Sequence, residues 1–101
     1  ILDGVPYRIH ALMTFGANLL VSHAETARAQ RALQAVGFHV HVDLFESPTA
    51  RFADILLPAT SPWEREALRP GFEIAPEAEE WIQLRPAMVA PVGQSRSDMQ
   101  I

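Results

Sequence analysis

Short apolar runs alternate with longer polar or amphipathic segments over the first sixty residues of the chain. The runs at residues 9–15, 38–42 and 54–57 have the length and the aliphatic and aromatic content of β-strands. Each is followed by a segment that suits a helix. Strands that alternate with helices form parallel sheets, because a crossover is needed to return the chain to its starting end. The pattern therefore predicts an α/β fold, a three-layer Rossmann-like domain with a short parallel sheet.

Three serines mark the expected helix starts, because a serine hydroxyl can satisfy a free N–H group of a first helical turn. Ser22 is followed three residues later by Glu25, the spacing of a capping box. Ser47 and Ser61 each precede a proline, which fits the first helical position. We expect the first of these helices to be the longest and to end at Gly37 in a left-handed conformation. Its apolar positions recur at helical spacing and form the expected buried face: Ala29, Ala32, Leu33 and Val36.

The last third of the chain gives a weaker pattern. The acidic stretch at residues 73–80 indicates a solvated face, and the run at 81–84 that follows it indicates a strand. Residues 85–93 are predicted to form an extended loop. A length of 101 residues and a hydrophobic fraction of 49% are those of one globular domain, residues 1–101. Because the chain starts with Ile1 and ends in an unfinished strand-like stretch, we expect it to be part of a larger protein.

The charge pattern argues against nucleic acid as a partner. The formal net charge is −4, and all eight basic residues are arginines scattered along the chain, so no basic stripe is available to follow a phosphate backbone. The absence of cysteine excludes disulfides, thiolate metal ligands and iron–sulfur ligands within these residues. No run in these residues is long and apolar enough to span a membrane, and none has the pattern of a signal peptide.

Polar turns follow the first two strands, at residues 14–18 and 43–49. Parallel sheets bind ligands at the edge formed by the carboxyl ends of their strands. Gly16 lets the backbone approach a ligand closely, and Asn18 offers amide donors and an acceptor. Helix N-termini at the same edge would stabilise a diphosphate. Asp43 can accept hydrogen bonds from ribose hydroxyls or from the amino edge of guanine. The turns therefore predict a nucleotide site without an obvious catalytic group.

Each of these residues also has a purely structural interpretation. The turn at residues 16–18 is compatible with a simple tight turn, Asp43 with a cap of its own turn, and the serines are caps first. His39 and His41 share one face of the second strand, a spacing found in metal sites. No third ligand lies nearby in sequence. A buried or edge pair of histidines is therefore favoured over a metal site, and we assign no metal ligand.

Four stretches resemble signatures of the molybdopterin-dependent oxidoreductases, the superfamily of dimethyl sulfoxide reductase and formate dehydrogenase. Residues 11–18 are similar to its strand followed by a Gly-x-Asn turn. Residues 42–59 resemble its longest signature, Asp-x-Phe-x-Thr-x-Thr-Ala followed by Ala-Asp-Ile-x-Leu-Pro-Ala. Residues 63–66 and 85–98 resemble two later elements. The resemblance covers nearly the whole chain, and residues 42–59 are its most specific part.

The resemblance implies a domain of a large enzyme that carries molybdenum or tungsten on molybdopterin guanine dinucleotide. In that family this Rossmann-like domain holds the guanosine and diphosphate part of one dinucleotide. The metal ligand, and an iron–sulfur cluster where one is present, lie in other domains, so the isolated piece is expected to be inactive. The resemblance assigns cofactor contacts to Gly16, Asn18, Asp43, Phe45, Ser47 and Thr49.

Several positions depart from the family pattern, among them Ser47, which replaces the usual threonine but keeps the hydroxyl, and the stretch at residues 67–72. Leu19 stands where proline is usual after the asparagine, and Pro48 stands where an acidic residue is common. A second hypothesis therefore remains, namely a cofactor-free structural or interaction domain of the same fold, as in subunits of respiratory complexes. The two hypotheses differ in whether the chain responds to a guanosine nucleotide.

Overall fold

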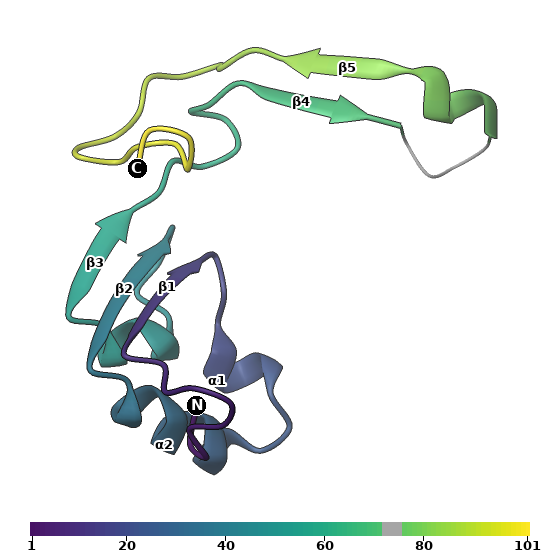
Figure 1. Cartoon of the computed structure of the whole chain (residues 1–101). Helices are drawn as coiled ribbons and strands as arrows, with labels where there is room; N and C mark the ends of the chain where they lie inside the picture. Colours follow the sequence, from purple (N-terminus) through teal and green to yellow (C-terminus); the bar gives the residue numbers. More distant parts are fainter. Residues whose placement is uncertain (72–75) are drawn as a thin grey trace. The chain divides into compact units, whose positions relative to one another are not determined.

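The computed structural model describes residues 1–71 and 76–101 and is shown in Figure 1. The chain forms two compact units, Ile1–Ala59 and Thr60–Ile101. The first contains the predicted parallel sheet, and the second contains an antiparallel pair of strands. Among the described residues, no helix has the length and apolar character needed to cross a bilayer.

A three-stranded parallel sheet forms the centre of the first unit. Its strands β1 (Ala11–Phe15), β2 (Phe38–Asp43) and β3 (Ile55–Pro58) lie in the order β1-β2-β3. All pairings are parallel, and Phe15 lies opposite Val42 near the carboxyl ends of the first two strands. The predicted α/β class and the short parallel sheet are confirmed.

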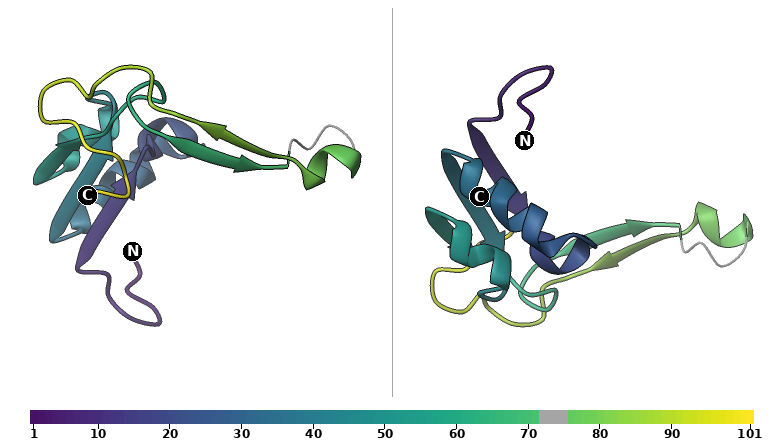
Figure 2. Two further views of the ribbon diagram at one scale, coloured as in Figure 1. Left: turned by 90° about the horizontal axis from the view of Figure 1, so that it is seen from above. Right: turned by 90° about the horizontal axis from the view of Figure 1, so that it is seen from below.

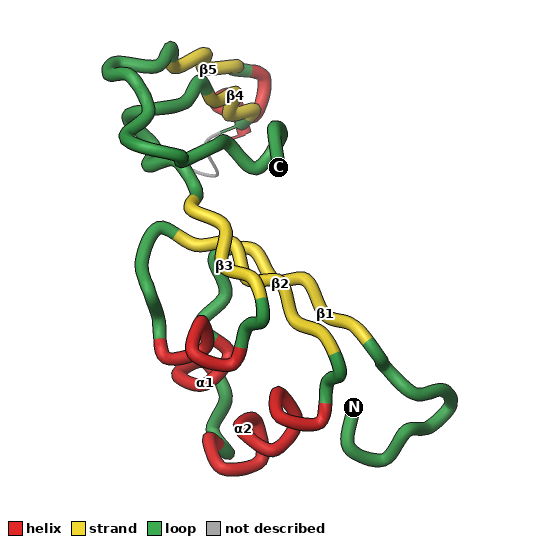
Figure 3. The backbone as a smooth tube through the Cα atoms, turned by 90° about the vertical axis from the view of Figure 1, so that its left-hand side faces the viewer, coloured by secondary structure: helices red, strands yellow, loops and turns green. Residues whose placement is uncertain are grey.

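The helical segments of the first unit lie together on one side of this sheet, as Figure 3 shows. They are α1 (Leu19–Ser22), α2 (Thr26–Ala35) and the 3₁₀ helix η1 (Pro48–Phe52). Right-handed crossovers put every connection on the same face when strands are added in one direction, as they are here. The described residues of this unit thus form two of the three expected layers. Leu20 of α1 and Leu33 of α2 are buried.

The capping box expected at Ser22 is wrong. Ser22 is the last residue of α1, and α2 begins after Glu25 without a side-chain cap. The Glu25 carbonyl instead accepts the N–H groups of Arg28 and Ala29, both at 3.0 Å. The turn after β1 enters a helix immediately at Leu19, so Ser22 is already helical and cannot cap the next element.

Gly37 is needed for a reason other than the one expected. The segment α2 ends at Ala35, and the backbone of Val36 is already extended. A Cβ atom at residue 37 would lie 3.2 Å from the carbonyl oxygen of His10, which precedes β1. The absence of a side chain therefore allows β2 to start close beside β1.

The second unit carries the antiparallel strands β4 (Ala67–Pro70) and β5 (Ile82–Arg85), which Figure 2 shows side by side. The strand expected at residues 81–84 is confirmed with a shift of one residue. The 3₁₀ helix η2 (Pro76–Glu80) precedes β5 and carries exposed glutamates of the acidic stretch, whereas Glu73 lies outside the described residues.

The helix expected after Ser61 does not form. Half of the predicted capping box is present, because a carboxylate oxygen of Glu64 accepts the Ser61 N–H at 2.7 Å. The Glu64 N–H closes a turn onto the Ser61 carbonyl, and the chain then continues into β4. Pairing of Ala67–Pro70 with β5 supplies the hydrogen bonds that a helix would have made.

Candidate functional site

The carboxyl ends of β1 and β2 bring the predicted ligand residues to one edge of the sheet. Gly16 follows β1 directly, and its N–H donates to the carbonyl of Val42 at 2.8 Å. Asp43 is the last residue of β2, and its own carbonyl accepts the Ala59 N–H beyond the end of β3. The two turns singled out in the sequence are therefore adjacent in space.

Gly16 gives this edge an open stretch of backbone. Its φ is +56°, a conformation that residues with a side chain rarely adopt. No heavy atom beyond its chain neighbours lies within 4 Å of the position that a Cβ atom would occupy. A ligand group can therefore approach the backbone where any other residue would place a side chain.

A buried threonine holds Asn18 at the same edge. The hydroxyl of Thr49 donates to the Oδ1 atom of Asn18 at 3.0 Å and accepts the N–H of Leu20 at 3.2 Å. Thr49 has no exposed surface. It therefore fixes the asparagine rather than facing the open side. With its oxygen bound to Thr49, Asn18 has two amide N–H donors left to offer to a ligand.

Asp43 keeps accepting capacity although its carboxylate is only 17% exposed. Its Oδ1 atom accepts the N–H of Leu44 at 2.7 Å, which is the capping role that the sequence left open. Its Oδ2 atom lies 3.3 Å from Nε2 of His41. Because a carboxylate oxygen can accept two hydrogen bonds, each oxygen retains one lone pair for a ligand.

Phe45 and Ser47 complete the loop after β2. Phe45 is 79% exposed, so its ring offers a flat apolar surface to solvent. Ser47 occupies the N-cap position of η1 with Pro48 directly after it, as predicted. The serine hydroxyl makes no capping bond, however, and lies 3.3 Å from Nε2 of His41 instead.

The expected convergence of three helix N-termini is wrong. The segment α1 has only four residues, η1 is a short 3₁₀ helix, and no helix starts at Ser61. Anion binding at this edge would depend mainly on backbone and side-chain N–H groups, because so short a helix develops little macrodipole.

Behind the edge, two histidines and a threonine form a buried hydrogen-bonded group. His39 and His41 are 1% and 0% exposed, and Thr14 lies opposite His41 in the strand register. The Thr14 Oγ1 atom is 3.0 Å from Nε2 of His39 and 2.6 Å from Nδ1 of His41. The shared face of the two histidines was visible in the sequence, but their link through Thr14 required the parallel register. Nowhere in residues 1–71 and 76–101 do three potential ligands gather around a metal position.

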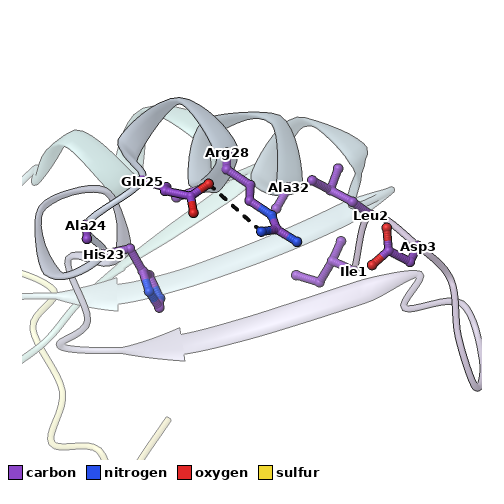
Figure 4. Close-up of a pocket in the computed structure, with 9 residues that line it drawn as sticks. Ile1, Leu2, Asp3, His23, Ala24, Glu25, Arg28 and Ala32 are labelled. Carbon is purple, nitrogen blue, oxygen red and sulfur yellow. Dashed lines mark ion pairs between the residues drawn. The ribbon is translucent and has the colours of Figure 1, made fainter.

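The first unit also has a pocket of about 470 Å³, shown in Figure 4, that none of the predicted site residues lines. Residues 1–3 line one side of it, and residues 23–25 with α2 as far as Ala32 line the other. The ion pair between Arg28 and Glu25 in this pocket spans 3.9 Å and both side chains are exposed, so it contributes little energy.

Comparisons with known proteins agree on one family. The family model of molybdopterin oxidoreductases matches residues 4–101. The assimilatory nitrate reductase catalytic subunit of Bacillus subtilis (strain 168) is 33% identical over 92% of this chain and 12% of its own length. The dimethyl sulfoxide/trimethylamine N-oxide reductase of Rhodobacter capsulatus is 33% identical over 85% of this chain and 10% of its own. The solved structure of acetylene hydratase from Pelobacter acetylenicus matches with a TM-score of 0.80 and 26% identity, over 95% of this chain and 13% of that one. The chain thus spans between a tenth and an eighth of the length of these relatives.

Proposed function

The chain belongs to the molybdopterin oxidoreductase family, and we propose that it is a nucleotide-binding domain of a molybdenum or tungsten oxidoreductase. In this proposal it holds the guanosine and diphosphate part of a molybdopterin guanine dinucleotide. One observation carries it: an open glycine turn, a fixed amide and a carboxylate meet at the carboxyl edge of a parallel sheet.

The diphosphate would bind beside the turn after β1. The backbone at Gly16 is open, and the amide of Asn18 has its oxygen engaged and its N–H groups to offer. N–H donors and an uncrowded backbone are what phosphate oxygens require. The donor set at this turn therefore fits an anion.

The guanosine would bind beside the loop after β2. Guanine presents two N–H donors on its Watson–Crick edge, and the Asp43 carboxylate accepts at both oxygens. The exposed ring of Phe45 is available for stacking on the base, and the Ser47 hydroxyl adds a polar contact. Adenine presents an acceptor where guanine has its ring N–H, so the carboxylate favours guanine.

The residues at this edge bind and orient; none of them is proposed as a metal ligand. The cofactor, when bound, supplies two-electron redox chemistry at its metal. The activity of the whole protein would therefore depend on parts of the polypeptide beyond these residues.

A titration of the ¹⁵N-labelled chain with GDP tests the proposal. We expect amide shifts at Gly16, Asn18 and Asp43 that saturate with GDP and are smaller with ADP. The Asp43→Asn variant should lose the preference for GDP, because an amide nitrogen would then face a guanine donor. No change of the amide shifts at millimolar GDP would instead support the hypothesis of a cofactor-free structural domain.

A further inference from the structure

We propose that His41 is a positioning residue that holds Asp43 and Ser47 for the nucleotide through a buried array formed by Thr14, His39 and His41. This inference rests on the proposed function and deepens it. It concerns how the binding carboxylate is fixed and at which pH it is fixed.

The ring of His41 connects the nucleotide edge with the interior of the sheet. Its Nε2 atom lies 3.3 Å from Oδ2 of Asp43 and 3.3 Å from Oγ of Ser47. Its Nδ1 atom lies 2.6 Å from Oγ1 of Thr14 on the neighbouring strand. Because the ring has no exposed surface, it has little freedom to turn away from either partner. Two proposed ligand contacts therefore share one rigid support.

The array continues inward to a backbone carbonyl. Oγ1 of Thr14 also contacts Nε2 of His39 at 3.0 Å, and Nδ1 of His39 lies 3.3 Å from the carbonyl oxygen of Phe52. The row thus begins at one acceptor, the Phe52 carbonyl, and ends at another, the carboxylate of Asp43. Between them lie four contacts, and each needs one proton to be a hydrogen bond.

When both histidines are neutral, the array has one proton too few to make all four hydrogen bonds. Two neutral imidazoles and one hydroxyl supply three protons for the four contacts. If the Asp43 contact is the one left empty, the Ser47 hydroxyl can donate to Nε2 of His41 in its place. One additional proton, which makes one of the two rings an imidazolium, completes all four contacts. The array therefore has a charged state that holds Asp43 and a neutral state in which Ser47 can turn inward.

The ionisable groups around the array are carboxylates. They are Asp43 at the edge and Asp54, whose Oδ2 atom accepts the backbone N–H of His39 at 2.7 Å. The segment α1 contributes no ionisable side chain, and Arg51 of η1 and the arginines of α2 are exposed. Because the complete array carries one proton more than the neutral array, we expect nucleotide affinity to fall as the pH rises and that proton is lost.

The first test compares GDP binding by the wild-type chain, His41→Phe and the control His23→Gln at about pH 6 and pH 8. His23 is exposed, so its variant keeps the array and experiences the same titration of the GDP phosphate. We expect His41→Phe to bind about tenfold more weakly at the lower pH, the loss expected for a hydrogen bond to a charged group, and to have a flatter pH profile. The control should follow the wild type. Equal affinity and an equal profile in His41→Phe would overturn this inference and leave the proposed function standing.

A second test needs no nucleotide and does not depend on the phenylalanine variant folding. The imidazole ¹⁵N resonances of His41 should shift in Asp43→Asn and in Thr14→Val, which keeps the shape of residue 14 but removes its hydroxyl. Unchanged His41 resonances in both variants would overturn the array. If the His41 resonances change in these variants but the wild-type chain does not bind GDP, the proposed function is contradicted, and the positioning role with it.

Discussion

The hydroxyl of Thr49 donates to the side-chain oxygen of Asn18 across 31 positions of sequence, at 3.0 Å. This bond joins the turn after β1 to the 3₁₀ helix after β2, so the two halves of the proposed site are fixed to each other. The same hydroxyl accepts the N–H of Leu20, which anchors the start of α1. One buried side chain thus determines the geometry of a site that it does not itself face.

We expect Thr49→Val to lower the free energy of unfolding by about 1–3 kcal/mol, because the buried N–H of Leu20 and the side-chain oxygen of Asn18 both lose their partner. Thr49→Ser keeps the hydroxyl and should cost less and retain GDP binding. Urea denaturation of both variants measures the difference. A valine variant as stable as the serine variant would show that the Asn18 and Leu20 groups find other partners.

Gly16→Ala should weaken GDP binding as well as stability, and Gly93→Ala is its matched control. Both glycines have a positive φ, +56° and +61°, and neither has a heavy atom within 4 Å of a built Cβ. Each alanine should therefore cost about 1–2 kcal/mol of backbone strain. Only residue 16 lies at the proposed site, so thermal melts of the two variants should agree while their GDP titrations differ. Equal GDP affinity in the two variants would argue against a ligand at Gly16.

The sheet and the meeting of its two polar turns at one edge were predictable from the sequence because they depend on local signals. Alternation of apolar runs and polar turns determines parallel pairing, and parallel pairing brings Gly16 and Asp43 together. Helix boundaries were not predictable in the same way. Ser22 and Ser61 carry correct capping signals, but the early turn at Leu19 and the pairing of Ala67–Pro70 override them.

The roles of Thr14 and Thr49 depend on contacts between residues far apart in sequence. Thr14 contacts His39 and His41, which lie 25 and 27 positions later. From the sequence, a threonine whose hydroxyl has such distant partners cannot be distinguished from one whose hydroxyl faces solvent. Only the register of β1 against β2 shows that Thr14 lies between the two imidazoles.

Leu33→Ala tests the buried face of α2. Leu33 is 4% exposed, so removing most of its side chain leaves a cavity and should lower the free energy of unfolding by about 2–5 kcal/mol. Gln34→Ala, one residue further along the same helix, is exposed and should change it by less than about 0.5 kcal/mol. Equal denaturation midpoints for the two variants would contradict the assigned helix face.

Glu64 should make the second unit sensitive to acid. Its carboxylate accepts the N–H of Ser61 at 2.7 Å and that of Val92 at 2.8 Å. These hydrogen bonds, those from Ser61 first, lower the pKa of Glu64 below its usual value of 4.5. The stabilisation is therefore complete above pH 4.5 and is lost as the pH falls through the lowered pKa.

Amide exchange at Val92 tests this role of Glu64. In the wild type it should increase as the pH falls through the lowered pKa of Glu64, and Glu64→Gln should show the increased exchange already at neutral pH. Exchange in the glutamine variant that matches the wild type at all pH values would remove Glu64 from this role.

Cofactor content of the longest polypeptide that carries this chain tests the proposed function in its natural context. Asn18→Ala and Asp43→Ala each remove a proposed contact to the dinucleotide, so both should lower bound metal and releasable guanine nucleotide together. Neither side chain belongs to the apolar core, so the fold should persist, and circular dichroism checks this. The control Gln34→Ala should retain full occupancy. Full metal and guanine content in both site variants would place the nucleotide elsewhere, whereas loss of guanine content with an intact fold would support this edge as its binding site.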